Sequence, residues 1–378
     1  MMPLRSSRRL LFLGLAAAGL LLQPTGARGQ VRWQDLVLTG GTSLESYNGN
    51  LPAVTISAVD STEQASAMVG ELGARGRLTL FSGQERSLDL QFDAGLRQFV
   101  AGGFEVRDYA SREWVGRSNL NYRESLSSLG DLWVEVGLGA RRVDDRPPMP
   151  LFLQPGYSTA DGRIRFQFRP VRGLFFDVQI MGEAADYATR SVTPQLELLD
   201  RRVLGAESGV TWGPDWRARL HTGLKVSEYR NQGTFDPRDP FRRDLTWSLG
   251  GTWTYTSSFF AQLGAEATIN RSNSDRPEYD ALSFRAVVSA PLPGSLSLSF
   301  FANLTEKWYK VRTDFARLVP GEEADNASVV YLELARPLLV NLDGAVRFGW
   351  NRAETDIGNA YFERYGGTLL LRYRPWGR

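Results

Sequence analysis

The chain has 378 residues, of which 42% are hydrophobic, and its 44 basic and 42 acidic side chains give a formal net charge of +2. This near balance provides no basic excess that would favour nucleic acid as a partner, and the absence of cysteine excludes a disulfide framework and a lipoprotein anchor. The mean hydropathy is −0.27, and no segment beyond residue 30 approaches the roughly 18 consecutive apolar residues of a membrane-spanning helix.

The first 29 residues have the pattern of a cleaved signal peptide. Arg5, Arg8 and Arg9 form a basic start, residues 10–22 are apolar or small, and Ala27-Arg-Gly29 offers a cleavage site. The apolar run is too short for a comfortable membrane helix. Removal of four arginines would change the charge balance to 40 against 42, a formal net charge of −2. We therefore expect residues 1–29 to be cleaved and residues 30–378 to form a single domain, since no linker divides them.

The remaining sequence alternates apolar and polar residues in about sixteen segments, each of the length of a tilted transmembrane strand. In the segment 216–228, for example, Trp216, Leu220 and Leu224 share one face, whereas Arg217 and Arg219 share the other. The clearest segments are 66–81, 87–100, 216–228, 245–255, 340–351 and 364–373.

Short and long connections alternate between these segments, as in bacterial barrels with tight periplasmic turns and longer outer loops. The expected short links are 82–85, 125–130, 170–173, 213–215, 256–258, 291–295 and 335–338, and the long links are 45–64, 144–160, 186–200, 231–243, 270–278, 312–326 and 352–359. The pattern predicts an all-β fold, a closed antiparallel transmembrane β-barrel of about 16 strands, with 14 or 18 left open. A soluble β-sandwich or propeller fits less well, because its strands would be shorter.

Aromatic residues cluster near the ends of the predicted strands, at the depth where Trp and Tyr favour a membrane interface. We expect them to form two girdles on the outside of the barrel. The girdle residues are Trp212, Trp216, Trp253, Tyr255, Trp308, Trp350, Tyr365 and Tyr373.

The last strand carries a second pattern: Arg364, Gly366, Leu369 and Leu371 follow each other at spacings of two, three and two. In this respect the chain resembles a Gram-negative outer-membrane β-barrel protein of porin size, a class whose last strand carries an assembly signal of this form. The resemblance implies recognition by the barrel-assembly machinery and contact with outer-membrane lipid and lipopolysaccharide. The chain departs from the class by continuing through residues 374–378 instead of ending in Phe.

Sixteen strands would enclose an aqueous channel, and the polar strand faces carry charge of both signs, which orders and filters polar solutes. The predicted function is therefore porin-like passive diffusion of small hydrophilic solutes, with a homo-oligomer left open. Basic residues predominate on 107–123, 163–169 and 216–228, which would favour anions if these strands share one side. The expected pore-lining residues are Arg117, Arg123, Glu135, Arg163, Arg165, Asp177, Glu183, Arg217, Arg219, His221, Glu266 and Asp343.

Two other functions remain as alternatives. One is the barrel component of an envelope export or structural assembly, such as polysaccharide export. The less favoured one is a barrel enzyme, which would need a histidine beside a hydroxyl or carboxylate. The single histidine, His221, has no evident Ser or Asp partner from spacing, and there is no G-x-S-x-G motif. We expect no cofactor or metal, because the Asp236–Asp239 stretch lacks the spaced ligands of a calcium loop. Thr193-Pro194 could begin a short helix at the barrel mouth.

Overall fold

A computed structural model gives the fold of the chain. It describes the residue ranges 31–49, 65–102, 112–126, 130–144, 156–187, 199–213, 216–234, 236–274, 278–310, 328–354 and 361–375. The predicted signal peptide and the predicted helix start at Thr193-Pro194 lie outside the described residues.

The described chain consists of sixteen strands and one short 3-10 turn. The strands are β1 Arg32–Gly49, β2 Ala65–Ser82, β3 Arg86–Gly102, β4 Arg112–Ser125, β5 Asp131–Asp144, β6 Tyr157–Val171, β7 Leu174–Tyr187, β8 Arg201–Trp212, β9 Trp216–Gly233, β10 Phe241–Thr256, β11 Phe260–Ser272, β12 Tyr279–Leu292, β13 Leu296–Tyr309, β14 Ser328–Leu339, β15 Leu342–Glu354 and β16 Tyr361–Tyr373, with η2 Pro293–Ser295 between β12 and β13.

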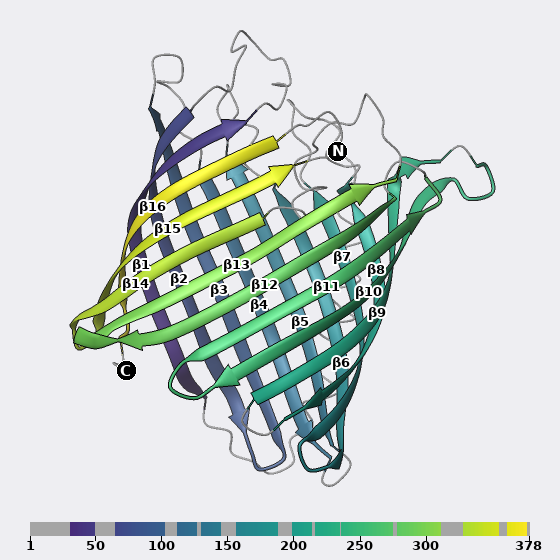
Figure 1. The fold of residues 1–378 in the computed structure, drawn as a ribbon, viewed down its shortest axis with the longest axis horizontal. Coiled ribbons are helices and arrows are strands. Elements are labelled where there is room, and N and C mark those ends of the chain that lie inside the picture. Colours follow the sequence, from purple (N-terminus) through teal and green to yellow (C-terminus); the bar gives the residue numbers. More distant parts are fainter. Residues whose placement is uncertain are drawn as a thin grey trace.

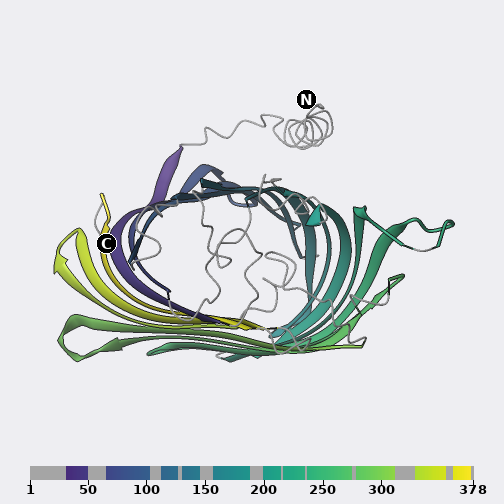
Figure 2. The same ribbon diagram turned by 90° about the horizontal axis from the view of Figure 1, so that it is seen from above.

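The strands form one closed antiparallel barrel in which each strand pairs with its neighbours in sequence and β1 pairs with β16 (Figure 1). Viewed from above, the wall forms a continuous ring (Figure 2). The predicted fold class is therefore confirmed, and the count is sixteen instead of the alternatives of 14 or 18.

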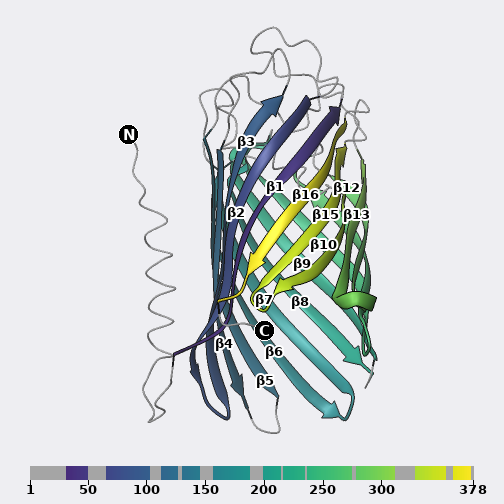
Figure 3. The same ribbon diagram turned by 90° about the vertical axis from the view of Figure 1, so that its left-hand side faces the viewer.

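The seam between the first and last strands closes the ring (Figure 3), with Leu38 opposite Tyr373 and Gly49 opposite Phe362. At Gly41 the two backbones come close. A Cβ atom there would come nearer than 3.0 Å to the carbonyl oxygen of Leu369 and within 2.7 Å of Leu370 Cδ2. Only glycine fits this position without moving the last strand.

The two faces of the wall differ in chemistry, because successive side chains on a strand point to opposite sides. Large apolar side chains on one face are exposed, as shown by Leu44 at 71% and Leu204 at 65%. Charged side chains at the alternate positions are buried, among them Glu45, Glu113 and Asp177. Since side chains converge inside a closed ring and diverge outside it, the charged face is the inner one. This arrangement reverses that of a water-soluble protein.

Most short connections lie where the sequence predicts them, and Gly173 in the β6–β7 turn has a φ of +80°, which favours glycine. The expected link at 335–338 is wrong. Strand β14 continues through Pro337 to Leu339, and Val340, assigned above to the next strand, lies in the turn before β15. Pro337 is tolerated because the β14–β15 register shifts between Pro337 and Leu339.

Candidate functional site: the inner wall of the barrel

Every residue expected to line the pore lies at an inner-face position of its strand. These residues are Arg117 and Arg123 on β4, Glu135 on β5, Arg163 and Arg165 on β6, Asp177 and Glu183 on β7, Arg217, Arg219 and His221 on β9, Glu266 on β11 and Asp343 on β15. The position follows from the registers, which place them in phase with buried polar residues and out of phase with the exposed apolar ones. Their role in lining a solute path remains a prediction.

The most buried of these charges is Asp177, whose side chain has no exposed surface. Its Oδ2 lies 2.7 Å from Arg219 Nη2, and its Oδ1 lies 3.7 Å from Arg165 Nη2. Arg219 also reaches Glu207 Oε1 at 2.7 Å. Two arginines and two acids from β6 to β9 thus form one compensated cluster on the wall.

Other predicted charges also have partners of opposite sign. Arg117 Nη2 lies 3.0 Å from Asp161 Oδ1, and Arg123 Nη2 lies 3.2 Å from Asp131 Oδ1. Glu183 pairs with Arg201, and Asp343 pairs with Arg374. Within the described ranges, Glu135, Arg163 and Arg217 form no ion pair. Most of the charged wall is therefore internally neutralised.

Trp133 on β5 is an inner-face residue that the sequence analysis missed. The guanidinium carbons of Arg123 and Arg165 lie 5.6 and 5.2 Å from its ring centroid. Such contacts stabilise both cations against the ring. Its phase with Glu135 on the same strand could have placed it on the inner face.

His221 has an acidic partner that its spacing in the sequence did not reveal. Its Nε2 lies 3.0 Å from Glu266 Oε2, two strands away, and its buried Nδ1 has no hydrogen-bond partner among the described residues. Among the residues that the structure describes, no hydroxyl group hydrogen-bonds to His221 in the way that the nucleophile of a triad does.

The wall from β10 to β13 is chemically different from the rest. Its inner face consists mainly of hydroxyl and amide side chains, interrupted by Glu266, Arg285 and Lys307 and, at one end of β10, by the paired Arg242 and Asp244. The neutral members are Thr246, Ser248, Thr252, Thr254, Gln262, Thr268, Asn270, Ser283, Ser289, Ser299, Asn303 and Thr305. Arg285 is exposed and forms no ion pair with another described residue; its guanidinium carbon lies 5.6 Å from the Phe301 ring centroid.

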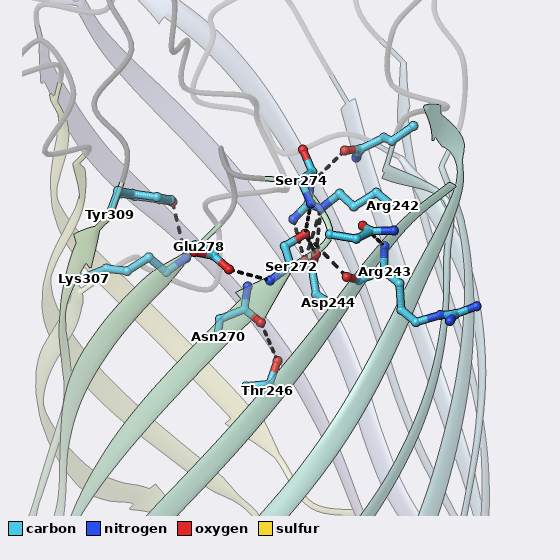
Figure 4. A network of polar contacts seen from close by, with 12 residues as sticks. Arg242, Arg243, Asp244, Thr246, Asn270, Ser272, Ser274, Glu278, Lys307 and Tyr309 are labelled. Atoms are coloured by element: carbon cyan, nitrogen blue, oxygen red, sulfur yellow. Dashed lines mark hydrogen bonds and ion pairs between the residues drawn. The ribbon is translucent and has the colours of Figure 1, made fainter. Parts of the chain in front are cut away.

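At one end of this wall, a network of polar contacts joins the ends of β10, β11 and β12 (Figure 4). The Arg242 guanidinium donates to both carboxylate oxygens of Asp244, with Nη2 2.7 Å from Oδ2, and the Ser272 hydroxyl donates to Asp244 Oδ1 at 2.6 Å. Deeper in the wall, the Thr246 hydroxyl donates to Asn270 Oδ1 at 2.7 Å. This network joins strand ends that the sequence alone did not connect.

The predicted girdle residues lie on the outer face of the barrel. Trp216 is opposite Tyr255 in the β9–β10 register, and the Trp253 and Tyr255 rings are stacked at 6.2 Å. Trp212 ends β8 beside them, and Trp308 lies near the other end of β13. Trp350 is opposite Tyr365, and Tyr373 ends the last strand.

The four residues of the predicted assembly signal fall on both faces of β16. Leu369 and Leu371 are exposed on the outer face, whereas Gly366 and Arg364 lie inside, with Arg364 Nη1 3.9 Å from Glu45 Oε2. Recognition of this strand by an assembly machinery remains a prediction.

Among the described residues, none of the helical segments is long and apolar enough to cross a membrane. The same residues contain no group of three or more histidine and acidic side chains that could hold a metal ion.

Comparisons with known proteins give structural neighbours only. No protein-family profile matches the sequence, and no curated protein matches it. OmpF of Salmonella typhi, solved in complex with daunomycin, is 10% identical with a TM-score of 0.42, over 90% of this chain and 98% of that one. The anion-selective porin from Comamonas acidovorans is 10% identical with a TM-score of 0.41, over 91% and 100%. A bacterial polysaccharide outer membrane secretin is 12% identical with a TM-score of 0.39, over 89% and 98%.

Proposed function

We propose that the chain is an outer-membrane channel through which small hydrophilic solutes diffuse passively. The observation that carries this proposal is the closed wall of sixteen strands with an apolar outer face and a charged inner face. Barrels of sixteen to eighteen strands leave an aqueous channel, whereas eight strands leave room only for packed side chains or a small ligand.

The outer face supports placement in a lipid membrane. Exposed leucines, valines and phenylalanines occur on strands all round the barrel, and a closed barrel leaves no unpaired strand edge in the hydrocarbon. The aromatic residues near the strand ends suit the two interfaces. Bacterial outer-membrane proteins have this architecture, so outer-membrane lipid and lipopolysaccharide are the proposed surroundings.

The inner face supports a water-filled path. Among the described residues, its ion pairs join side chains on one strand, on neighbouring strands or on strands two apart, so these side chains run along the wall and not across the lumen. Charges that are paired along the wall leave a polar surface that small solutes can pass.

The pairing also bears on charge selectivity. The basic residues on β4, β6 and β9, which the sequence suggested would favour anions, are largely compensated by acids on β5, β6, β7 and β8, such as Asp131, Asp161, Asp177 and Glu207. The proposed channel therefore discriminates weakly between small anions and cations. Arg285 on the neutral wall, like Arg163 and Arg217, is exposed and forms no ion pair with another described residue, so these three arginines favour anions.

Liposome swelling tests the proposal directly. Liposomes containing the refolded protein are placed in iso-osmotic solutions of neutral sugars and polyols of increasing size. The expected result is rapid swelling with small solutes and a steady decline with solute size, absent from liposomes made with heat-unfolded protein. Swelling no faster than in protein-free liposomes at every size would reject a passive channel.

A further inference from the structure

Three polar contacts on the inner wall pass over a strand that has glycine at the crossing point. Arg219 on β9 reaches Asp177 on β7 across Gly209 of β8. His221 on β9 reaches Glu266 on β11 across Gly250 of β10. Arg117 on β4 reaches Asp161 on β6 across β5, which has Gly137 and Gly139 at the registered positions.

The His221 crossing shows the geometry most clearly. Gly250 is the registered partner of both His221 and Glu266. A Cβ atom on Gly250 would lie 2.5 Å from His221 Cε1 and 2.6 Å from Nε2. Real Cβ contacts essentially never fall below 3.0 Å, so the imidazole occupies the space that any other residue would fill.

The other two crossings follow the same rule. A Cβ atom on Gly209 would lie 2.8 Å from Arg219 Nη2 and 3.0 Å from its Nε. On Gly137 it would lie 2.5 and 2.6 Å from the two Asp161 carboxylate oxygens. In each case the nearest group in the way is the polar end of a side chain, although at Gly250 the Ala265 carbonyl oxygen also lies 3.1 Å from the Cβ position.

Other inner-face glycines do not have this role. A Cβ atom on Gly95 of β3 would have only the Leu72 carbonyl oxygen within 4 Å, at 3.8 Å, which is ordinary contact. Glycine on the inner wall is thus compatible with free space. At Gly137, Gly209 and Gly250 the close atoms belong to a side chain of a crossing pair, whereas at Gly41 they belong to Leu369 and Leu370 of the paired strand.

We propose that Gly137, Gly209 and Gly250 set the free width of the lumen, because they let Asp161, Arg219 and His221 lie flat against the wall. The backbone of the glycine lies directly beneath the side chain, so a Cβ atom inserted between them displaces the side chain towards the lumen. This inference rests on the proposed channel function where it concerns conduction, but the position of the side chains can be measured without it.

His221 gives the sharpest test, because it is the single histidine of the chain. The untagged protein, folded in detergent, is treated with diethyl pyrocarbonate, and the rate of imidazole modification is followed by absorbance. The side chain of His221 is only 12% exposed. The proposal predicts several-fold faster modification in Gly250→Ala, and an unchanged rate in the matched control Gly95→Ala. Equal rates in wild type and Gly250→Ala would overturn it.

Conduction provides the second readout. Single-channel conductance of Gly250→Ala is expected to fall by roughly a tenth to a third, since lumen diameter limits flow, and to be unchanged in Gly95→Ala. In the His221→Ala background, Gly250→Ala should have no further effect. His221→Ala is expected to fold, because the Glu266 side chain it leaves is 42% exposed.

The two readouts separate the possible failures. A fall in conductance that persists without the histidine would mean that Gly250 acts through the backbone, which contradicts the proposal. If no variant conducts but Gly250→Ala still speeds modification, the channel function fails and the role of the glycine in positioning the histidine stands.

Discussion

Arg219 on β9 and Asp177 on β7 form a 2.7 Å ion pair across the intervening strand, and the Asp177 side chain has no exposed surface. A buried carboxylate of this kind depends on its partner, since an unpaired buried charge is costly. Arg165, at 3.7 Å, is the other cation beside it. The wall of the barrel thus contains one carboxylate whose removal from water is compensated mainly by a residue two strands away.

We predict that Arg219→Ala destabilises the folded barrel by about 2–4 kcal/mol, because Asp177 stays buried without its main partner. The free energy of unfolding can be measured by urea titration in detergent micelles or lipid vesicles. Arg117→Ala is the matched control. Its ion pair with Asp161 also passes over a strand but is half exposed, so its loss should cost less than about 1 kcal/mol. Equal losses in the two variants would show that the burial of Asp177 does not matter.

Closure of the barrel should depend on Gly41. Replacing it with alanine brings a Cβ atom against the backbone of Leu369 at the seam, and backbone cannot rotate away as a side chain can. We expect Gly41→Ala to lower the unfolding free energy by about 2 kcal/mol or more and to lower the yield of heat-resistant barrel in gel-shift assays. Gly70→Ala on β2 is the control, since nothing lies within 4 Å of its Cβ position. A stable Gly41→Ala barrel would mean that the seam can widen freely.

The outer and inner faces should respond oppositely to added charge. Leu249→Arg on β10 places a cation on the lipid-facing side and should cost about 2–4 kcal/mol if it lies near the bilayer midplane. The neighbouring change Ser248→Arg points inwards and should alter stability by less than about 1 kcal/mol. Unfolding titrations in lipid vesicles measure both. The reverse order would invert the assignment of the two faces.

Charge selectivity should respond to Arg285. This residue is exposed on the neutral wall and forms no ion pair with another described residue, so Arg285→Gln removes positive charge without leaving an acid unpaired. In a salt gradient, the reversal potential should shift towards cation preference. Arg123→Gln is the comparison, because it also removes one positive charge, but one that is paired with Asp131. A shift as large for Arg123→Gln would show that pairing on the wall does not govern selectivity.

Alternation of residue type predicted the strands and their faces well, because it depends on one strand at a time. Arg217, Arg219 and His221 fall on the inner face simply by being two residues apart on β9. The strand ends were predicted less well. The link expected at 335–338 lies at residues 340–341 instead, since Pro337 is tolerated within β14 at a shift in register.

Contacts between side chains on different strands could not be predicted. A period of two gives the face on which a side chain lies, but it does not give the register, which decides the residue that it lies beside on the next strand. The contacts His221–Glu266 and Arg219–Asp177 depend on the registers of two successive strand pairs. The contacts of Trp133 with Arg123 and Arg165 also depend on such registers, although its phase on β5 alone would have placed it on the inner face. The role of the glycines at the crossings can be recognised only when those registers are known.

We propose that the sixteen-strand wall encloses an open, water-filled path, which can be measured by recording from single refolded molecules in a planar lipid bilayer. We predict discrete conductance steps that scale with salt concentration and that are smaller in Gly250→Ala than in Gly95→Ala. Barrels shown to be folded and inserted, yet electrically silent at every salt concentration and voltage, would contradict it.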